Sequence, residues 1–204
     1  MSNQKPIKLK KVTIVIPCYN AGFSLVRTVN SLKFQTFKDF EIIIVNDGSN
    51  NKLTLTILKS LKQQNLKIIN QKNKGLASAR NRGALNSNSE FILFLDSDDW
   101  LDNRAIELFV KFLNKNKKIS YVYSNIVNKD ENNAVLKKTF NFFEQLFSNQ
   151  IPYSILIRRE DFIKVGVYDE DMPLMGFEDW DLNIRLGKLN LYGSCLDKNL
   201  FFYS

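Results

Sequence analysis

The sequence of 204 residues contains no histidine, and this absence excludes several kinds of site. Without an imidazole the chain cannot build a Ser-His-Asp or Cys-His nucleophile, nor a zinc centre with histidine ligands. Any metal ion must therefore be held by oxygen atoms, which favours magnesium, manganese or calcium.

Cysteine is almost as scarce, since Cys18 and Cys195 are the only two. Two thiols cannot form a disulfide framework or a four-thiolate zinc site, and their number is typical of a reducing compartment. No segment approaches the roughly 20 apolar residues of a membrane-spanning helix. The apolar run at 12–18 follows a basic start, but it is too short to span and lacks a small-residue cleavage site. We expect a cytoplasmic protein whose membrane contact, if any, is peripheral.

Negative charge is in deficit, because the net charge is +8 and the isoelectric point is about 9.4. Some of the lysines form two clusters, Lys5, Lys8, Lys10 and Lys11 near the start and Lys115, Lys117 and Lys118 further along. Such patches attract nucleic acid, anionic lipid or phosphorylated substrates, although solvated surface lysines explain them equally well. No nucleic-acid-binding motif accompanies the charge, so we expect no nucleic-acid partner.

Short apolar runs alternate with helical patterns, which indicates an α/β fold whose mainly parallel sheet is flanked by helices. Strands are expected at 12–17, 40–45, 66–69, 91–95, 120–127 and 153–157. Helices are expected at 25–32, 55–61, 75–85, 106–113, 159–165 and 179–189, and 130–149 is expected to be a mobile stretch. The length predicts one domain, residues 1–204, with one half at about 1–100 and a looser half at about 101–204.

Three aspartates, Asp96, Asp98 and Asp99, directly follow the apolar strand expected at 91–95. Crowded carboxylates repel one another unless a cation or solvent relieves them, which favours metal or nucleotide binding for Asp98. The alternative is helix capping, a role that we assign to Asp102 just before the next helix. For Asp99 the two interpretations stay open.

Open parallel sheets bind ligands at the carboxyl ends of their strands. Tyr19, Asn20 and Asp47 stand at two such ends, beside the aspartates already described. The segment 73–83 adds Lys74 and Arg80, cations that favour phosphate oxygens near a helix N-terminus. Packing of its small residues against the sheet explains the segment equally well. The absence of GxGxxG and of a Walker lysine motif argues against dinucleotide and P-loop binding.

A later acidic group, Glu178, Asp179 and Asp181, opens the helix expected at 179–189. These acids could simply offset the helix dipole. The alternative is a general base, for which a carboxylate beside the aromatic Trp180 is suitable.

Five motifs, taken in order, resemble glycosyltransferase family 2, the inverting transferases with a GT-A fold, and the resemblance runs from about residue 12 to 189. The matching segments are VIPCYN at 15–20, IVNDGS at 44–49, NKGLASARNRG at 73–83, FLDSDD at 94–99 and GFEDWD at 176–181. Asn46 stands where the family has an acid. Many relatives also continue beyond 201–204 with a loop that contains arginine and histidine, which is consistent with a short member or with a truncated acceptor-binding half.

The resemblance implies transfer of a sugar from a nucleotide-diphosphate donor, a UDP-sugar, to a hydroxyl of a glycan or lipid-linked acceptor in cell-surface polysaccharide or glycoconjugate synthesis. The implied nucleotide-binding residues are Pro17, Tyr19, Asn20, Asp47, Lys74, Gly75, Arg80, Asp96 and Ser97. Asp98 would hold Mn²⁺ or Mg²⁺ against the diphosphate. Asp179 would be the catalytic base, with Glu178 beside it shaping acceptor binding.

Within that set the resemblance implies narrower roles. Pro17, Tyr19 and Asp47 would line the base and ribose pocket, with Asp47 accepting a hydrogen bond from uracil. Arg80 would approach the nucleotide or its phosphates, and Asp96 would contact the ribose. Two other functions stay open, a sugar-phosphate nucleotidyltransferase and a nucleotide-sugar-binding module without catalysis.

Overall fold

The computed structural model describes residues 9–64, 66–137, 139, 141–173 and 176–204, so Lys5 and Lys8 lie outside the described residues. Within these ranges nine strands form one sheet in the order β3-β2-β1-β4-β8-β6-β9-β5, and β7 pairs with β6. The strands are β1 (Val12–Cys18), β2 (Phe40–Asp47), β3 (Lys67–Gln71), β4 (Phe91–Phe94), β5 (Trp100–Leu101), β6 (Tyr121–Asn128), β7 (Ala134–Leu136), β8 (Leu156–Arg158) and β9 (Gly193–Tyr203). The helices are α1 (Ser24–Lys33), α2 (Lys52–Gln63), α3 (Leu76–Leu85), α4 (Ala105–Lys115), α5 (Phe142–Gln145), α6 (Arg159–Lys164) and α7 (Glu178–Lys188).

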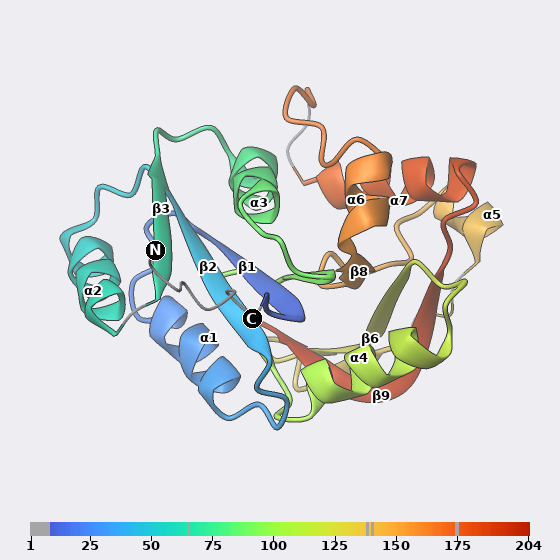
Figure 1. Cartoon of the computed structure of the whole chain (residues 1–204), viewed down its shortest axis with the longest axis horizontal. Coiled ribbons are helices and arrows are strands. Elements are labelled where there is room, and N and C mark those ends of the chain that lie inside the picture. Colours follow the sequence, from blue (N-terminus) through green and yellow to red (C-terminus); the bar gives the residue numbers. More distant parts are fainter. Residues whose placement is uncertain (1–8, 65, 138, 140, 174–175) are drawn as a thin grey trace, which may run out of the picture.

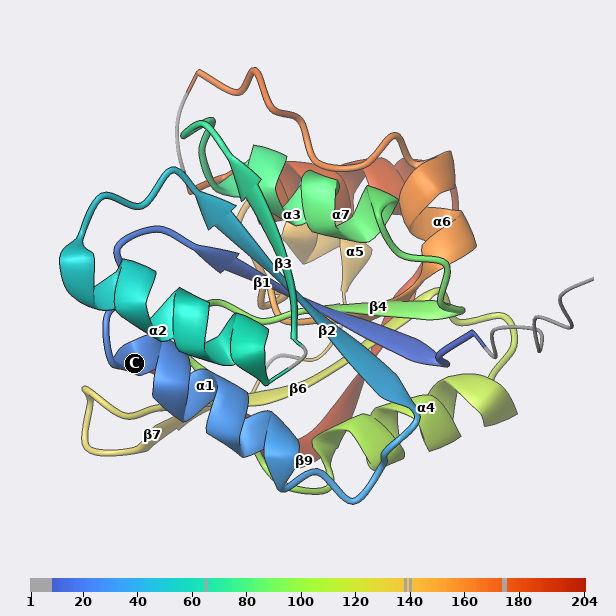
Figure 2. The same ribbon diagram turned by 60° about the vertical axis from the view of Figure 1, so that its left-hand side comes forward.

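The first half of the chain is a parallel sheet of β3, β2, β1 and β4. Figure 1 shows α1, α2 and α4 against one face of the sheet and α3, α6 and α7 against the other, and the turned view of Figure 2 agrees. Every residue of β1 is buried because both of its faces are covered. Ile14 and Ile16 pack into the core cluster that includes α1, α2 and α4, whereas Val15 points to the opposite cluster.

Antiparallel pairs join the second half to the first. β8 lies between β4 and β6 and is antiparallel to both, and β9 then runs parallel to β6 and antiparallel to β5. This places β9, from the end of the chain, beside β5, which follows the acidic cluster of β4. The strand order therefore places β9 near the edge of the sheet where β1, β2 and β4 end.

Helix α3 lies unusually close to the sheet, as the small residues of 73–83 predict. A Cβ atom built on Gly83 would stand 2.3 Å from Cγ1 of Val15, nearer than any real Cβ contact. Only glycine permits this approach of α3 to β1. The helix also begins sharply, since Gly75 at its N-cap has a φ of 89° that other residues rarely adopt.

Each strand and helix that the sequence predicts is present, with ends that differ by a few residues. The predicted strand at 153–157 is shorter, because β8 begins only at Leu156. β5, β7, α5 and the long β9 were not predicted. Two of these, β7 and α5, lie inside the stretch 130–149 that was expected to be mobile. Asp197, Lys198 and Asn199 interrupt the apolar pattern of β9, and its register against β6 shifts at the same place.

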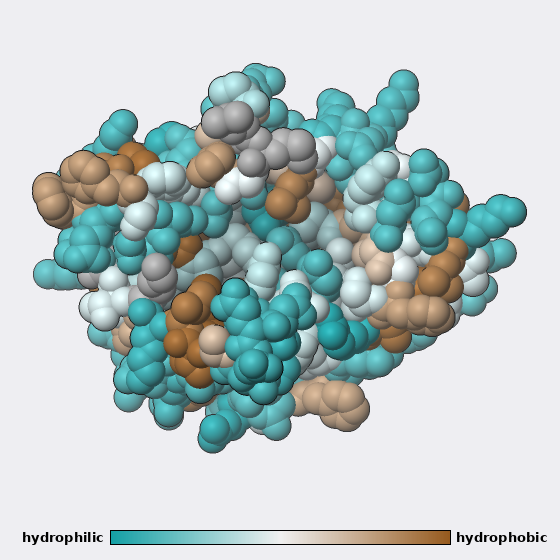
Figure 3. Space-filling view, turned by 180° about the vertical axis from the view of Figure 1, so that it is seen from behind, coloured by the Kyte–Doolittle hydropathy of each residue, from teal (hydrophilic) through white to brown (hydrophobic). Residues whose placement is uncertain are grey.

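The surface carries both charge and an apolar projection. Lys115, Lys117 and Lys118 are exposed at the end of α4. In Figure 3 an apolar patch projects at the left edge over α5, where Phe143 and Phe147 are 70% and 71% exposed. In the part of the chain that the structure describes, every helix is too short or too polar to cross a membrane.

Candidate active site

The carboxyl ends of β1, β2 and β4 meet at a cavity of about 340 Å³, which we call the strand-end cavity. Seven of the residues singled out in the sequence line it: Pro17, Tyr19, Asp47, Gly75, Asp96, Ser97 and Asp98. Tyr19 is half exposed at its rim. The topology therefore assembles the first four motifs into one concave surface, as expected for parallel strands.

Asp47 is buried and its carboxylate organises the start of α3. Oδ1 accepts hydrogen bonds from Nε2 of Gln71 at 2.8 Å and from the backbone N–H of Lys74 at 2.9 Å. Oδ2 accepts the backbone N–H of Gly75 at 2.9 Å. A carboxylate offers about four acceptor positions, so these three bonds leave little capacity for a ligand. The predicted contact with uracil stays a prediction, and the observed role of Asp47 is to hold the loop before α3.

Asn20 connects two strand ends and does not line the strand-end cavity. Its Oδ1 accepts the backbone N–H groups of Asn50 and Asn51, each at 2.9 Å, and its own N–H donates to Oγ of Ser49 at 3.0 Å. Its φ of 52° is tolerated because asparagine adopts the left-handed region more readily than most residues. Asn20 therefore fixes the loop after β2 against β1.

Asp98 and Asp99, which follow β4, have different environments. Asp98 is exposed, and among the described residues its carboxylate forms no hydrogen bond or ion pair. Asp99 is buried, accepts hydrogen bonds from the hydroxyl of Tyr153 and the backbone N–H of Ser204, and burial raises its pKa to about 7. The carboxyl group of Asp99 therefore bonds to other parts of the protein and does not line the strand-end cavity.

The capping role assigned to Asp102 needs a correction. The N-cap of α4 is Arg104, which makes no side-chain capping bond. The carboxylate of Asp102 accepts the N–H of Arg104 at 2.9 Å, so it closes the turn before the helix. Its backbone carbonyl, not its side chain, accepts the N–H of Ala105. The two residues between Asp102 and the helix account for the difference, since a capping side chain must stand directly before the first turn.

Arg80 is the centre of a buried charge network and is only 1% exposed. Its Nη2 lies 2.9 Å from both oxygens of Asp96, and its Nη1 lies 2.8 Å from Oε1 of Glu178. The guanidinium also lies 4.7 Å from the ring centre of Tyr153. Burial alone would lower the pKa of Arg80, but the neighbouring carboxylates outweigh it and raise the pKa. The guanidinium of Arg80 faces Asp96 and Glu178, and its predicted approach to the nucleotide or its phosphates stays a prediction.

Glu178 completes the network from the side of α7. Its Oε2 accepts the backbone N–H of Gly176 at 3.1 Å, while Oε1 binds Arg80. Together with Lys74 it lines a smaller cavity of about 150 Å³. The late acidic motif is thus joined to the strand-end cavity through Arg80 and Asp96.

Asp179 opens into a different cavity of about 420 Å³, which we call the Asp179 cavity. Its lining is largely apolar and comes from β6, β7, β9 and the residues before β8. Oδ1 of Asp179 accepts the N–H of Trp180 at 2.8 Å, and Oδ2 accepts Nδ2 of Asn149 at 3.0 Å. Burial raises the pKa of Asp179, which is the direction required of a carboxylate that must take up a proton near neutral pH. Asp181, by contrast, pairs with Arg185 of the same helix at 2.7 Å, and both side chains are half-buried.

Tyr153 and Asn149 belong to the site, although sequence reasoning did not single them out. The hydroxyl of Tyr153 accepts the backbone N–H of Asp96 at 3.0 Å and donates to Asp99, while the ring faces the Asp179 cavity. Neither residue lies in a recognisable motif. Their roles arise from the fold, which brings the segment before β8 against the loop after β4.

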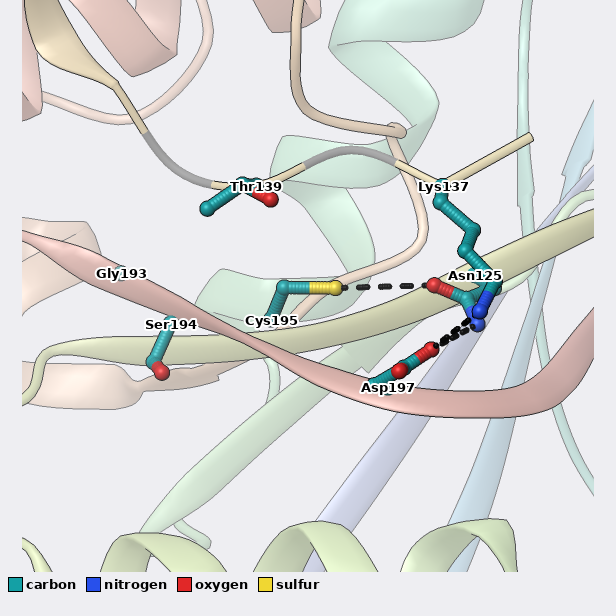
Figure 4. A pocket seen from close by; sticks show the side chains of 7 residues that line it. All are labelled: Asn125, Lys137, Thr139, Gly193, Ser194, Cys195 and Asp197. Atoms are coloured by element: carbon teal, nitrogen blue, oxygen red, sulfur yellow. Dashed lines mark hydrogen bonds and ion pairs between the residues drawn. The ribbon is translucent and has the colours of Figure 1, made fainter.

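A further cavity of about 390 Å³ is lined by residues of β6 and β9 together with Lys137 and Thr139, and none of the predicted site residues lines it. Figure 4 shows Asn125 beside Lys137, with its amide bonded to Asp197 and to the thiol of Cys195. Burial raises the pKa of the Cys195 thiol, so the sulfur is a poor nucleophile. We assign no chemistry to this cavity.

The family match covers all five motifs described in the sequence. The family model described as "Glycosyl transferase family 2" matches residues 13–181. The poly(ribitol-phosphate) beta-N-acetylglucosaminyltransferase TarP of Staphylococcus aureus (strain N315) is 41% identical over 103 residues, 48% of this chain and 32% of TarP. WfgD of Escherichia coli, named a UDP-Glc:alpha-D-GlcNAc-diphosphoundecaprenol beta-1,3-glucosyltransferase, is 32% identical over 131 residues, 62% of this chain and 49% of WfgD. The chain therefore spans less than half the length of these curated relatives.

Solved structures agree on the fold. TarS 1-349 of S. aureus in complex with UDP-GlcNAc superposes with a TM-score of 0.80 at 21% identity, covering 95% of this chain and 58% of that one. The mannosyltransferase PcManGT of Pyrobaculum calidifontis, in complex with GDP-Man and Mn²⁺, gives a TM-score of 0.71 at 14% identity, covering 97% and 58%. The predicted GT-A fold is confirmed by these similarities.

Proposed function

This chain belongs to glycosyltransferase family 2, and from that premise we propose that it transfers a sugar from a UDP-sugar to a hydroxyl of a glycan or lipid-linked acceptor, with inversion. The observation that carries the proposal is a pair of carboxylates on either side of the Arg80 network. Among the described residues the carboxylate of Asp98, in the strand-end cavity, has no hydrogen-bond partner, and Asp179 is desolvated in a second cavity. The complex of TarS with UDP-GlcNAc supports UDP as the carrier. In this proposal residues at about 1–100 bind the donor and those at about 101–204 bind the acceptor.

The residues of the strand-end cavity suit a nucleotide diphosphate. Pro17 and Tyr19 offer an apolar wall for the base, and Asp96, held by Arg80, lines the cavity where the ribose would lie. Among the described residues no three Cys, Asp or Glu side chains converge as a ready-made metal centre. Asp98 nevertheless fits Mn²⁺ or Mg²⁺, because such ions are often held by one or two carboxylates together with substrate phosphates and water. When bound there, the ion would neutralise charge on the leaving diphosphate.

Asp179 supplies the other half of the chemistry. Its carboxylate accepts the proton of the acceptor hydroxyl as the acceptor oxygen forms a bond to the anomeric carbon. The bond between that carbon and the diphosphate oxygen breaks in the same displacement, and the nucleoside diphosphate leaves with the electron pair. A single displacement inverts the anomeric configuration and needs no covalent nucleophile, in agreement with a chain that has no histidine.

Asp98→Asn tests the donor part of this proposal. The wild type is expected to bind UDP more tightly with Mn²⁺ than with EDTA, and the variant is expected to lose that difference, about tenfold or more in Kd, because a carboxylate ligand is gone. Calorimetric titration measures both values. Asp102→Asn is the matched control, because its carboxylate serves the turn before α4.

Turnover of UDP-glucose, UDP-galactose or UDP-N-acetylhexosamines with a panel of acceptors tests the reaction itself. Tight UDP binding without any transfer would contradict the proposed activity and leave a binding module. Release of pyrophosphate from a sugar phosphate and a nucleoside triphosphate would replace the proposal by nucleotidyl transfer.

A peripheral contact with an anionic membrane is the second part of the proposal, supported by the net charge of +8 and the exposed Lys115, Lys117 and Lys118. Co-sedimentation is expected with vesicles that contain phosphatidylglycerol and not with phosphatidylcholine alone. Replacing the three lysines by glutamine should weaken it. Binding that is independent of anionic lipid would contradict this contact.

A further inference from the structure

Asn149 stands at the wall of the Asp179 cavity in a single orientation. Its Oδ1 accepts Nε2 of Gln145 at 3.1 Å and the backbone N–H of Ile151 at 3.3 Å. With two donors on its oxygen, the amide nitrogen must be the atom that faces Asp179, and it donates to Oδ2 at 3.0 Å. The carboxamide therefore presents a donor, and not an acceptor, to the carboxylate.

Gln145 is itself fixed, which makes Asn149 a rigid support. The side chain of Gln145 is fully buried, and its Oε1 accepts the backbone N–H of Gln150 at 2.7 Å. Its backbone carbonyl accepts Nε1 of Trp180 on α7 at 2.5 Å. The short helix α5 is thus tied to the helix that carries Asp179, and Asn149 closes the connection at the carboxylate.

Other groups also face Asp179, from each element packed around it. The backbone N–H of Trp180 binds Oδ1, Arg80 on α3 lies close enough to lower the pKa of Asp179, and Glu178 on the same helix raises it. Tyr168, before α7, lies within electrostatic range, and Tyr153 and Tyr203 share the cavity. Among the described residues, Asn149 makes the one side-chain hydrogen bond to this carboxylate.

We infer that Asn149 is a positioning residue for the proposed reaction: it aims the carboxylate of Asp179 into its cavity and stabilises the ionised state that accepts a proton. The catalytic part of this inference rests on the proposed function. The hydrogen bond and its effect on Asp179 do not depend on that function, so the two can fail separately.

The direction of the effect follows from the donor. A hydrogen bond donated to a carboxylate favours the charged form and lowers its pKa, so loss of Asn149 raises the pKa of Asp179. One such bond corresponds to about one pH unit. Because Asp179 must be ionised to take the proton, the acid limb of the kcat–pH profile moves to higher pH. At pH values below the acid limb, kcat of the Asn149 variants falls about tenfold relative to the wild type. At pH values above it, kcat recovers.

The first measurement needs neither metal nor substrate. Carboxyl-labelled aspartate in the full chain gives an NMR titration for Asp179, whose signal is assigned by its loss in Asp179→Asn. Asn149→Ala is expected to move that titration upward by about one unit. Asn149→Asp, which keeps an acceptor for Gln145 but removes the donor, is expected to move it further. An unchanged titration in both variants would overturn the inference.

The second measurement is kcat and KM for UDP-GlcNAc with Mn²⁺ as a function of pH. The Asn149 variants are expected to shift the acid limb and leave KM for the donor unchanged. Asn141→Ala is the matched control, because Asn141 caps α5 without contacting Asp179 and its loss loosens the same segment. A fall in kcat at every pH without a shifted limb would assign Asn149 a purely structural role. If the Asn149 variants shift the NMR titration of Asp179 but the wild type transfers no sugar, the contact between Asn149 and Asp179 is supported and the proposed function is contradicted.

Discussion

Asp179→Asn is expected to leave UDP binding unchanged and to reduce sugar transfer by about 10²–10⁴-fold, the usual contribution of a general base. The substitution keeps the shape of the side chain and the acceptor for the N–H of Trp180, so α7 should begin as before. It removes the atom that takes up the acceptor proton. Calorimetric titration with UDP and initial-rate measurements on the same preparation separate the two effects.

Asp181→Asn provides the matched control for Asp179→Asn. It removes an acid from the same helix turn, but this acid is bonded to Arg185. Its expected effect on transfer is small, because Asp181 does not line the Asp179 cavity. Equal loss of transfer in both variants, or a loss of UDP binding in Asp179→Asn, would contradict the assignment of Asp179 as the base.

Arg80→Met is expected to lower the free energy of unfolding by about 3–5 kcal/mol, the largest stability effect that we foresee in this chain. The guanidinium is 1% exposed and is shared by Asp96 and Glu178. Removing it leaves two carboxylates in a poorly solvated place without a counter-charge. Urea denaturation followed by fluorescence measures the change, and Arg104→Met, at an exposed arginine, should stay within about 0.5 kcal/mol of the wild type.

The cause of that loss is tested by a double-mutant cycle. If the destabilisation comes from carboxylates left without a partner, Arg80→Met should cost less in a Glu178→Gln background, because one of the two charges has already been neutralised. An equal cost in both backgrounds would mean that lost packing against Tyr153 and Tyr168, and not charge, explains the effect.

The parallel half of the fold could be predicted because its sequence pattern is strong. Strands buried on both faces, such as β1 and β4, appear as unbroken apolar runs, and their helices show clear spacing. β9 was not predicted, because its sequence lacks such an apolar run. Its middle is charged and exposed, and its pairing depends on β6 and β5, which lie far away in the sequence. β5 has two residues, too few to show any periodicity.

The sequence predicted that several motif residues lie together, but it did not predict their contacts. Chain topology alone brings the motif residues after β1, β2 and β4 to one edge. Which oxygen of Asp47 or which nitrogen of Arg80 meets a neighbour depends on side-chain geometry, and there the structure shows internal partners. Tyr153 and Asn149 could not be found, because they act only once the second half of the chain folds back onto the first.

The position of the buried Arg80 guanidinium depends on an apolar contact between Gly83 on α3 and Val15 on β1. Arg80 and Gly83 are three residues apart on α3 and therefore lie on neighbouring parts of one helix face. Because Val15 touches the bare backbone at Gly83, the helix axis sits at a fixed depth above β1, and the guanidinium is carried to a fixed height between two acids. A methyl group at position 83 would push α3 away from β1. The guanidinium of Arg80 would then move relative to Asp96 and Glu178.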